Sequence, residues 1–338
     1  MNLEFLLFSA LKVVGVFALV MPMIAYSVMA ERKISAWIQD RVGPNRVGPQ
    51  GMLQPLADGI KFLLKEDFTP AHVRKAYFWL APAIAMVPAF LTMAVIPFGS
   101  TIGHQKMVIA DLNVGILYTF GIVSLGVYGI VLAGYASNSK YPFLGGIRSS
   151  AQMISYELAM GLAVIPVFML VGDLNLSKVI EYQSNHGWLV LYAPFSFVIF
   201  LVSSFAETNR LPFDMPESES ELVAGYHTEY SSMKFALFFM GEYANMISAS
   251  AMMVTLFFGG WTLPWFSEPA LSNAWMYGAL HIGVFIAKML AFMVLFIWIR
   301  WMLPRFRYDQ LMDLGWRRFL PFALLNVLGY AVWLWVRA

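Results

Sequence analysis

The 338-residue chain has no cysteine and few charged residues. Without cysteine it can form no disulfide and can supply no thiolate to zinc, to a haem attachment site or to an iron–sulfur cluster. Asp, Glu, Lys and Arg together make up 12% of the residues, about half the share that covers the surface of a soluble domain. A membrane location is therefore expected, and any redox centre has to lie on another protein.

Long apolar runs account for most of the chain. Each of eight runs is long enough to cross a bilayer as a helix, which takes about 20 residues. Continuous runs favour helices, because the strands of a membrane barrel would alternate apolar and polar residues. We predict an all-α membrane protein with a single domain over residues 1–338. Its eight predicted spans lie near 5–29, 76–96, 112–135, 150–172, 188–206, 233–258, 277–303 and 318–336.

The positive charges of the loops predict the orientation. The loops after the first, third, fifth and seventh spans carry fifteen Lys and Arg residues, whereas the other loops carry only Lys106 and Lys178. Loops rich in Lys and Arg stay in the cytoplasm. Both termini are therefore predicted to be periplasmic, in the inner membrane of a bacterium.

One of the two long cytoplasmic loops covers residues 30–75. Within it Leu53, Leu56, Ile60, Leu63 and Leu64 recur at helical spacing, which predicts a short amphipathic helix. This helix lies on the membrane surface or packs on the bundle without touching lipid, and the sequence leaves both open.

Two carboxyl groups fall inside predicted spans. A charged side chain at the centre of a bilayer costs about 2.5–3.5 kcal/mol, so such residues are candidates for function. Glu157 and Glu242 lie at similar depths from the cytoplasmic ends of their spans. They belong to one proton path, or each is neutral and hydrogen-bonded to a neighbouring helix. Lys288, near the middle of the seventh span, is a candidate counter-charge.

The second long loop, residues 207–232, is unusually acidic. Its acids form a negative funnel leading to the buried carboxyls, or else a solvated loop or a docking surface for a basic partner. Glu207 and Arg210 stand three residues apart at a helix end, which predicts an ion pair between them. The six acids are Glu207, Asp214, Glu217, Glu219, Glu221 and Glu229.

Fingerprints of soluble enzymes are missing from the sequence. It contains no Gly-x-Gly-x-x-Gly, no phosphate-binding loop and no His-Glu-x-x-His, so we predict neither nicotinamide binding nor a metal site. The aromatic and methionine content, including Phe239 and Met240, suits a tunnel for an isoprenoid ligand. Lipid contact and helix packing explain such residues equally well.

Four segments resemble a known family, that of the H subunit of bacterial respiratory NADH:quinone oxidoreductase, or complex I, which is called subunit 1 in mitochondria. The first runs from Glu31 to Glu66 and includes QDRVGPNRVGPQGMLQPLADGIKFLLKE. The others are ASNSKYPFLGGIRSSAQMISYELAM, AETNRLPFDMPESESELVAGYHTEYSSMKFALFFMGEYANM and WIRWMLPRFRYDQLMDLGW. The pattern departs from the family at Leu211, Met215 and His227.

The resemblance implies roles for particular residues. It suggests that Glu157, Glu207, Glu217, Glu219, Glu221 and Glu242 form an acidic path coupling quinone chemistry to proton movement, with Arg148 as a charge partner, in addition to the Arg210 that the spacing pairs with Glu207. It also suggests that Arg32, Arg41, Asp58, Phe239, Met240 and Arg300 line the tunnel by which quinone reaches its reduction site.

The same resemblance implies a division of labour within a larger complex. Quinone would be the substrate, and this chain would bind no cofactor of its own. FMN and iron–sulfur clusters are expected on peripheral partner subunits at the cytoplasmic face, and antiporter-like subunits in the membrane. Two alternatives stay open, a membrane subunit of a hydrogenase-type complex and an ion-coupled transporter.

Overall fold

The fold is a bundle of long helices, described in a computed structural model for residues 3–102, 105–263 and 274–337. The long helices are α1 (Leu3–Ile38), α3 (Lys75–Thr92), α4 (Gly115–Ala136), α5 (Lys140–Val171), α8 (Pro194–Glu207), α10 (Ser232–Phe257), α11 (Ala274–Met302) and α13 (Leu320–Arg337). Each coincides with one of the predicted apolar runs. The all-α prediction is confirmed.

The connections contain short elements. The helices are α2 (Gln54–Leu64), α6 (Leu176–His186), α7 (Leu189–Tyr192), α9 (Glu219–Leu222) and α12 (Tyr308–Asp313), with the helical turns η1 (Pro49–Gly51), η2 (Gly225–His227) and η3 (Leu314–Phe319). Strands β1 (Gly99–Ile102) and β2 (Gln105–Met107) pair antiparallel. The predicted amphipathic helix is present as α2.

Six helices of the described residues are long and apolar enough to cross a membrane, which establishes a multi-pass protein. Helix α8 is apolar but shorter, and α10 carries Lys234, Glu242 and Asn245 among its apolar residues. The count of eight spans stays a prediction. The six are Leu7–Ile38, Lys75–Thr92, Gly115–Ala136, Lys140–Val171, Trp275–Met302 and Tyr308–Arg337.

Three predicted boundaries were wrong by several residues, one of them the start of the fifth span, predicted near residue 188 although α8 begins at Pro194. Helix α1 continues to Ile38, nine residues beyond the apolar run, because Glu31 is accommodated inside the bundle. Helix α5 begins at Lys140, not near residue 150, so Arg148 lies in its third turn and does not open the span.

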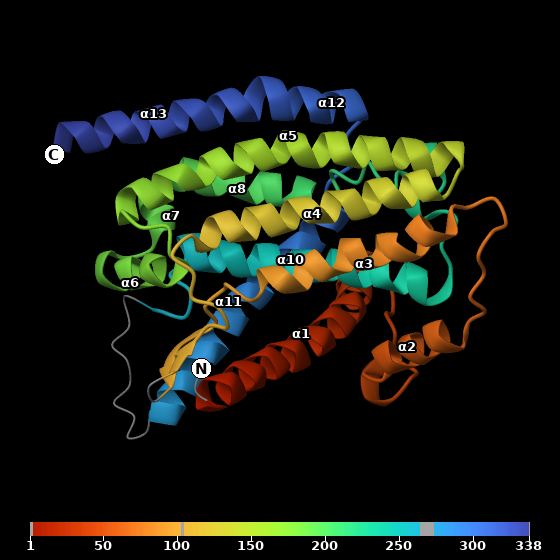
Figure 1. The fold of residues 1–338 in the computed structure, drawn as a ribbon, viewed down its shortest axis with the longest axis horizontal. Helices are drawn as coiled ribbons and strands as arrows, with labels where there is room; N and C mark the ends of the chain where they lie inside the picture. The colour runs from red at the N-terminus through yellow and green to blue at the C-terminus, as the bar shows by residue number, and fades with distance from the viewer. Residues whose placement is uncertain (1–2, 103–104, 264–273, 338) are drawn as a thin grey trace.

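The helices pack in layers, and the termini and α2 lie at opposite ends of the bundle (Figure 1). Figure 1 shows α3, α4 and α5 side by side, α13 covering α5, and α11 crossing the bundle obliquely. Close packing of α3 on α4 depends on Gly129, where a Cβ would lie 2.5 Å from the backbone nitrogen of Ala85. The two termini lie at one end of the bundle and α2 at the other (Figure 1). This agrees with an even number of crossings.

Candidate functional site

A buried carboxylate, Glu31, is the centre of a cluster of charged and polar side chains. Its Oε2 lies 2.9 Å from a guanidinium nitrogen of Arg210 and accepts a hydrogen bond of 2.6 Å from the hydroxyl of Tyr243. The guanidinium of Arg300 donates to the other carboxylate oxygen. Glu31 and Arg210 are 6% and 3% exposed. Buried charges of this kind need paired partners, because desolvation costs several kcal/mol per ion.

Arg210 joins this carboxylate to a second one. Its Nε lies 2.6 Å from Oε1 of Glu242, and its guanidinium carbon lies 4.3 Å from the ring centre of Tyr243. Helices α1 and α10 therefore meet at Arg210, and α11 joins them through the contact of Arg300 with Glu31. We call Glu31, Arg210, Glu242, Tyr243 and Arg300 the central ion cluster.

The predicted ion pair between Glu207 and Arg210 is wrong. Helix α8 ends at Glu207, and Asn209 has a φ of 52°, so the chain leaves the helix before Arg210. The spacing of three residues brings side chains together only while the helix continues. Arg210 instead reaches the central ion cluster, and both carboxylate oxygens of Glu207 are buried without a hydrogen-bond partner in the structure.

The first part of the acidic loop, with Asp214 and Glu217, folds against the cluster, whereas the two acids of α9 are exposed. Asp214 pairs with Arg305 at 2.7 Å, yet burial raises the pKa of Asp214 to about 6. Burial also raises the pKa of Glu217, and the negative charges of Glu242 and Asp214 raise it further. Both carboxyls can therefore bind a proton at a higher pH than a carboxyl in water.

His227 is not a counter-charge for this loop. Its Nδ1 lies 3.8 Å from Oε1 of Glu217, but burial lowers the pKa of His227 to about 4, so the ring is neutral at pH 7. Gly225 allows the loop to double back, since its φ is 58° and a Cβ there would collide with the carbonyl oxygen of Pro216. The backbone thus holds Glu217 against the bundle.

Two small cavities lie beside the acids. One, of about 30 Å³, is lined by Glu217 and Glu242, and the other, of about 40 Å³, by Glu207. Thr208 and Asn245 line both cavities. Each cavity has about the volume of one water molecule. Asn245 therefore stands between a cavity that holds two of the acids and a largely apolar cavity that holds Glu207.

The remaining predicted path residues lie around this core. The hydroxyl of Ser124 donates a hydrogen bond to a carboxylate oxygen of Glu157. Arg148 pairs with Glu221 at 2.5 Å. Glu219 is exposed on α9. Glu157 thus contacts α4 through Ser124, and Arg148 is paired with Glu221 of the acidic loop.

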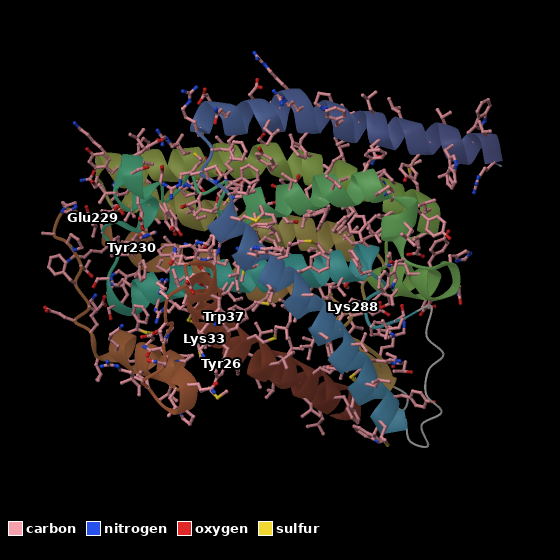
Figure 2. The ribbon with its side chains drawn as sticks, turned by 180° about the vertical axis from the view of Figure 1, so that it is seen from behind. Tyr26, Lys33, Trp37, Glu229, Tyr230 and Lys288 are labelled. Carbon is pink, nitrogen blue, oxygen red and sulfur yellow. The ribbon has the colours of Figure 1, made fainter. Side chains whose placement is uncertain are left out.

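The structure does not bring Lys288 to the acids. Its ammonium group donates to the carbonyl oxygens of Phe258, Gly260 and Thr262 at 2.7, 2.9 and 2.6 Å, where α10 ends. Figure 2 shows Lys288 far along the bundle from Glu229 and Tyr230 of the acidic loop. A cation at the end of a helix is stabilised by the helix dipole, so Lys288 caps α10 and does not neutralise the path.

An apolar groove of about 420 Å³ lies between α1, α2 and α10. Four of the six predicted tunnel residues line it, namely Arg32, Asp58, Phe239 and Met240. Arg32 donates to Asp58 at 2.7 Å across the groove. The other two lie elsewhere, since Arg300 binds Glu31 and Arg41 donates to Gln39 and Ser35 at the exposed end of α1.

Sequence reasoning missed Glu31, Tyr243 and Arg305. Glu31 follows the first predicted span, which ends near residue 29, and only the continuation of α1 to Ile38 reveals that it is buried. Among the described residues no group of three or more His, Asp and Glu could hold a metal ion.

Comparison with known proteins identifies relatives along nearly the whole chain. Residues 11–331 match a family described as NADH dehydrogenase. The chain is 54% identical over 321 residues to an H subunit of the NADH-quinone oxidoreductase of Geobacter metallireducens, covering 94% of this chain and 93% of the relative. It is 49% identical over 331 residues to an H subunit of the same oxidoreductase in Cytophaga hutchinsonii, with 96% of each chain covered. The H subunit of Flavobacterium psychrophilum is 48% identical over 342 residues, with 97% of each covered.

Proposed function

Because the chain belongs to the NADH dehydrogenase family, with H subunits of NADH-quinone oxidoreductase as relatives, we propose that it couples quinone reduction to proton translocation. In this proposal the groove between α1, α2 and α10 admits the quinone, and the central ion cluster responds to its reduction. The chain itself transfers no electrons. It acts as the membrane subunit in which the reaction of a partner is converted into proton movement.

One observation carries this proposal, namely that groove and cluster share their walls. On α1, Arg32 lines the groove while the preceding residue, Glu31, belongs to the cluster. On α10, Met240 lines the groove and Glu242 pairs with Arg210. A charge that appears at the inner end of the groove would therefore act on the cluster over a short, poorly screened path.

The proposed mechanism is electrostatic. Reduction of a quinone to a quinol takes two electrons and two protons, and negative charge develops at the head group before the protons arrive. The electrons come from an iron–sulfur cluster that we expect on a partner subunit. The new charge alters the proton occupancy of Asp214 and Glu217, then of Glu242, and through the cavities at Asn245 that of Glu207 and Glu157.

The proposal includes the surroundings of the chain. The relatives are named as subunits of a complex, so other subunits of that complex are expected as partners, with FMN and iron–sulfur clusters bound by those at the cytoplasmic face. The end that carries α2 and the acidic loop faces the cytoplasm, because most Lys and Arg of the loops gather there. Both termini then lie in the periplasm of a bacterium, with the bundle in its inner membrane.

Purification through a tag on this chain, in mild detergent, tests the assignment. Flavin, iron and NADH:quinone reductase activity should co-purify with it. Nickel with little response to quinone would instead indicate a hydrogenase-type complex. A chain that purifies alone, stable and free of cofactors, would indicate a transporter and contradict the proposal.

A further inference from the structure

Helix α2 forms one wall of the groove but has little packing of its own. None of its residues is buried, and its apolar side chains Leu56, Leu63 and Leu64 are 63, 67 and 82% exposed. Burial of apolar surface is the main force that fixes a helix on a bundle. Besides the ring contact of Phe62 with Phe235, polar contacts at its middle and at its C-terminal end hold α2 in place.

The contact on the α1 side is the pair of Arg32 and Asp58. Their atoms lie 2.7 Å apart, and Gln54 donates to the same carboxylate at 3.0 Å. This pair also lines the groove, so it belongs to the site already described. It fixes the middle of α2 to α1 and leaves the end of α2 free to move relative to α10.

The contact on the α10 side is built around a buried lysine. Lys234 is 6% exposed, and its ammonium group lies 3.0 Å from a carboxylate oxygen of Asp67 and 2.7 Å from the hydroxyl of Thr69. It also lies 4.0 Å from the ring centre of Trp79. A buried ammonium group persists only with such partners, and two of them, Asp67 and Thr69, belong to the segment that follows α2.

Ser232 strengthens the same junction. Its hydroxyl lies 3.0 Å from the carbonyl oxygens of Phe62 and Lys65, where α2 ends. In the same turn of α10, Met233 and Ala236 line the groove. One turn of α10 therefore both holds the end of α2 and forms the facing wall of the groove.

We propose that Lys234 is a positioning residue that sets the width of the groove between α2 and α10. It does not line the groove itself and acts through α2. Since a quinone tail gains its affinity from contact with both walls, the lysine determines how tightly long isoprenoid tails are held. This inference rests on the proposed quinone groove, and its test separates the two claims.

The first measurement reports the position of α2 without any quinone. Gly59 lines the groove, and a Cβ there would meet no atom within 4 Å, so Gly59→Cys places a thiol in the groove. Because the natural chain has no cysteine, labelling of its band by N-ethylmaleimide in membranes reports only this thiol. We expect Lys234→Met to speed labelling about fivefold by opening the end of α2, and Lys234→Arg to leave the rate near that of Gly59→Cys alone.

The second measurement reports quinone binding in the assembled complex with Gly59 intact. Lys234→Met should raise the KM for a quinone with a long tail about fivefold, leave the KM for a quinone with a short tail unchanged, and change kcat little. The matched control is Lys106→Met, which removes an ion pair of 2.6 Å with Asp111 at the other end of the bundle and should change neither measurement.

The outcomes separate the claims. An unchanged labelling rate in Lys234→Met overturns the positioning role. Faster labelling with both KM values unchanged keeps the effect of Lys234 on α2 but contradicts the quinone groove, and with it the proposed link to tail binding. If Lys234→Met prevents assembly, Asp67→Asn weakens the same contact from its half-exposed side, and the same changes in labelling and KM are required of it.

Discussion

The side chain of Arg210 bridges two carboxylates, with nitrogens 2.9 Å from Glu31 and 2.6 Å from Glu242. Arg210 lies in the loop after α8 and is 3% exposed. The two acids come from α1 and α10, so a single guanidinium ties three separate segments together. Its removal would leave Glu31 with Arg300 but would take from Glu242 its ion-pair partner in the interior of the bundle.

Arg210→Met should therefore destabilise the protein strongly. Breaking a buried pair by removing one partner costs about 3–5 kcal/mol, because the remaining charge is left uncompensated. We expect little assembled complex in native gels of detergent extracts. Arg307→Met is the control, since the side chain of Arg307 is 71% exposed and pairs with Asp309 at the surface. Normal assembly of Arg210→Met would contradict the buried ion pairs.

Asn245→Leu should remove the polar side chain that the two cavities share. The leucine has the same branched arrangement of heavy atoms, but it is bulkier and offers no hydrogen bond to a water that relays a proton from Glu242 to Glu207. We expect the number of protons pumped per NADH to fall about tenfold in proteoliposomes while NADH oxidation with an artificial electron acceptor continues. Asn326→Leu, which removes a hydrogen bond of 2.8 Å to Ser196 on another face, should pump normally.

Glu207→Gln should separate stability from function. The carboxyl of Glu207 is buried and neither of its oxygens accepts a hydrogen bond, so the neutral amide removes no stabilising contact. We expect the thermal unfolding midpoint to stay the same or rise, and proton pumping to fall. A clear drop in the midpoint would indicate that the carboxylate has a stabilising partner after all.

Asp214 should give the stability of the complex a pH dependence. Burial raises the pKa of Asp214 to about 6, above the value of about 4 expected in the unfolded chain, so the folded state binds this proton more tightly. The contribution of Asp214 to the free energy of unfolding is thus complete below about pH 4 and is lost as the pH rises through about 6. In thermal unfolding between pH 5 and 7.5, the midpoint of wild type relative to Asp214→Asn should fall with rising pH. A constant difference would contradict the raised pKa.

Hydropathy predicted the helices because a bilayer leaves few alternatives to a continuous apolar helix. It failed at the ends of α1 and α5, where charged residues continue the helix beyond the apolar run, Glu31 within buried ion pairs and Lys140 at an exposed helix start. The burial of Glu31 could not be predicted, because it depends on Arg210 and Arg300, which are distant in sequence.

The sequence could single out the acids but not their partners. Glu157, Glu207, Glu217 and Glu242 stood out because acids are rare in spans and because the loop resembles a known motif, and their role in a proton path stays a prediction. Their partners follow from tertiary contacts. Lys288 has the right sign and lies in a span, yet it caps the far end of α10, and spacing alone placed Arg210 beside Glu207 instead of Glu242.

The central claim is that the acids around Arg210 couple quinone reduction to proton movement, and Glu242→Gln tests it most directly. Proton pumping and NADH:quinone turnover should be measured in the same proteoliposomes, with transfer to an artificial acceptor as a check on the electron path. Glu181→Gln, an exposed acid on α6, is the matched control. The account predicts that Glu242→Gln loses about nine tenths or more of its pumping while transfer to the artificial acceptor is intact. Full pumping at a normal ratio of protons to electrons in this variant would contradict it.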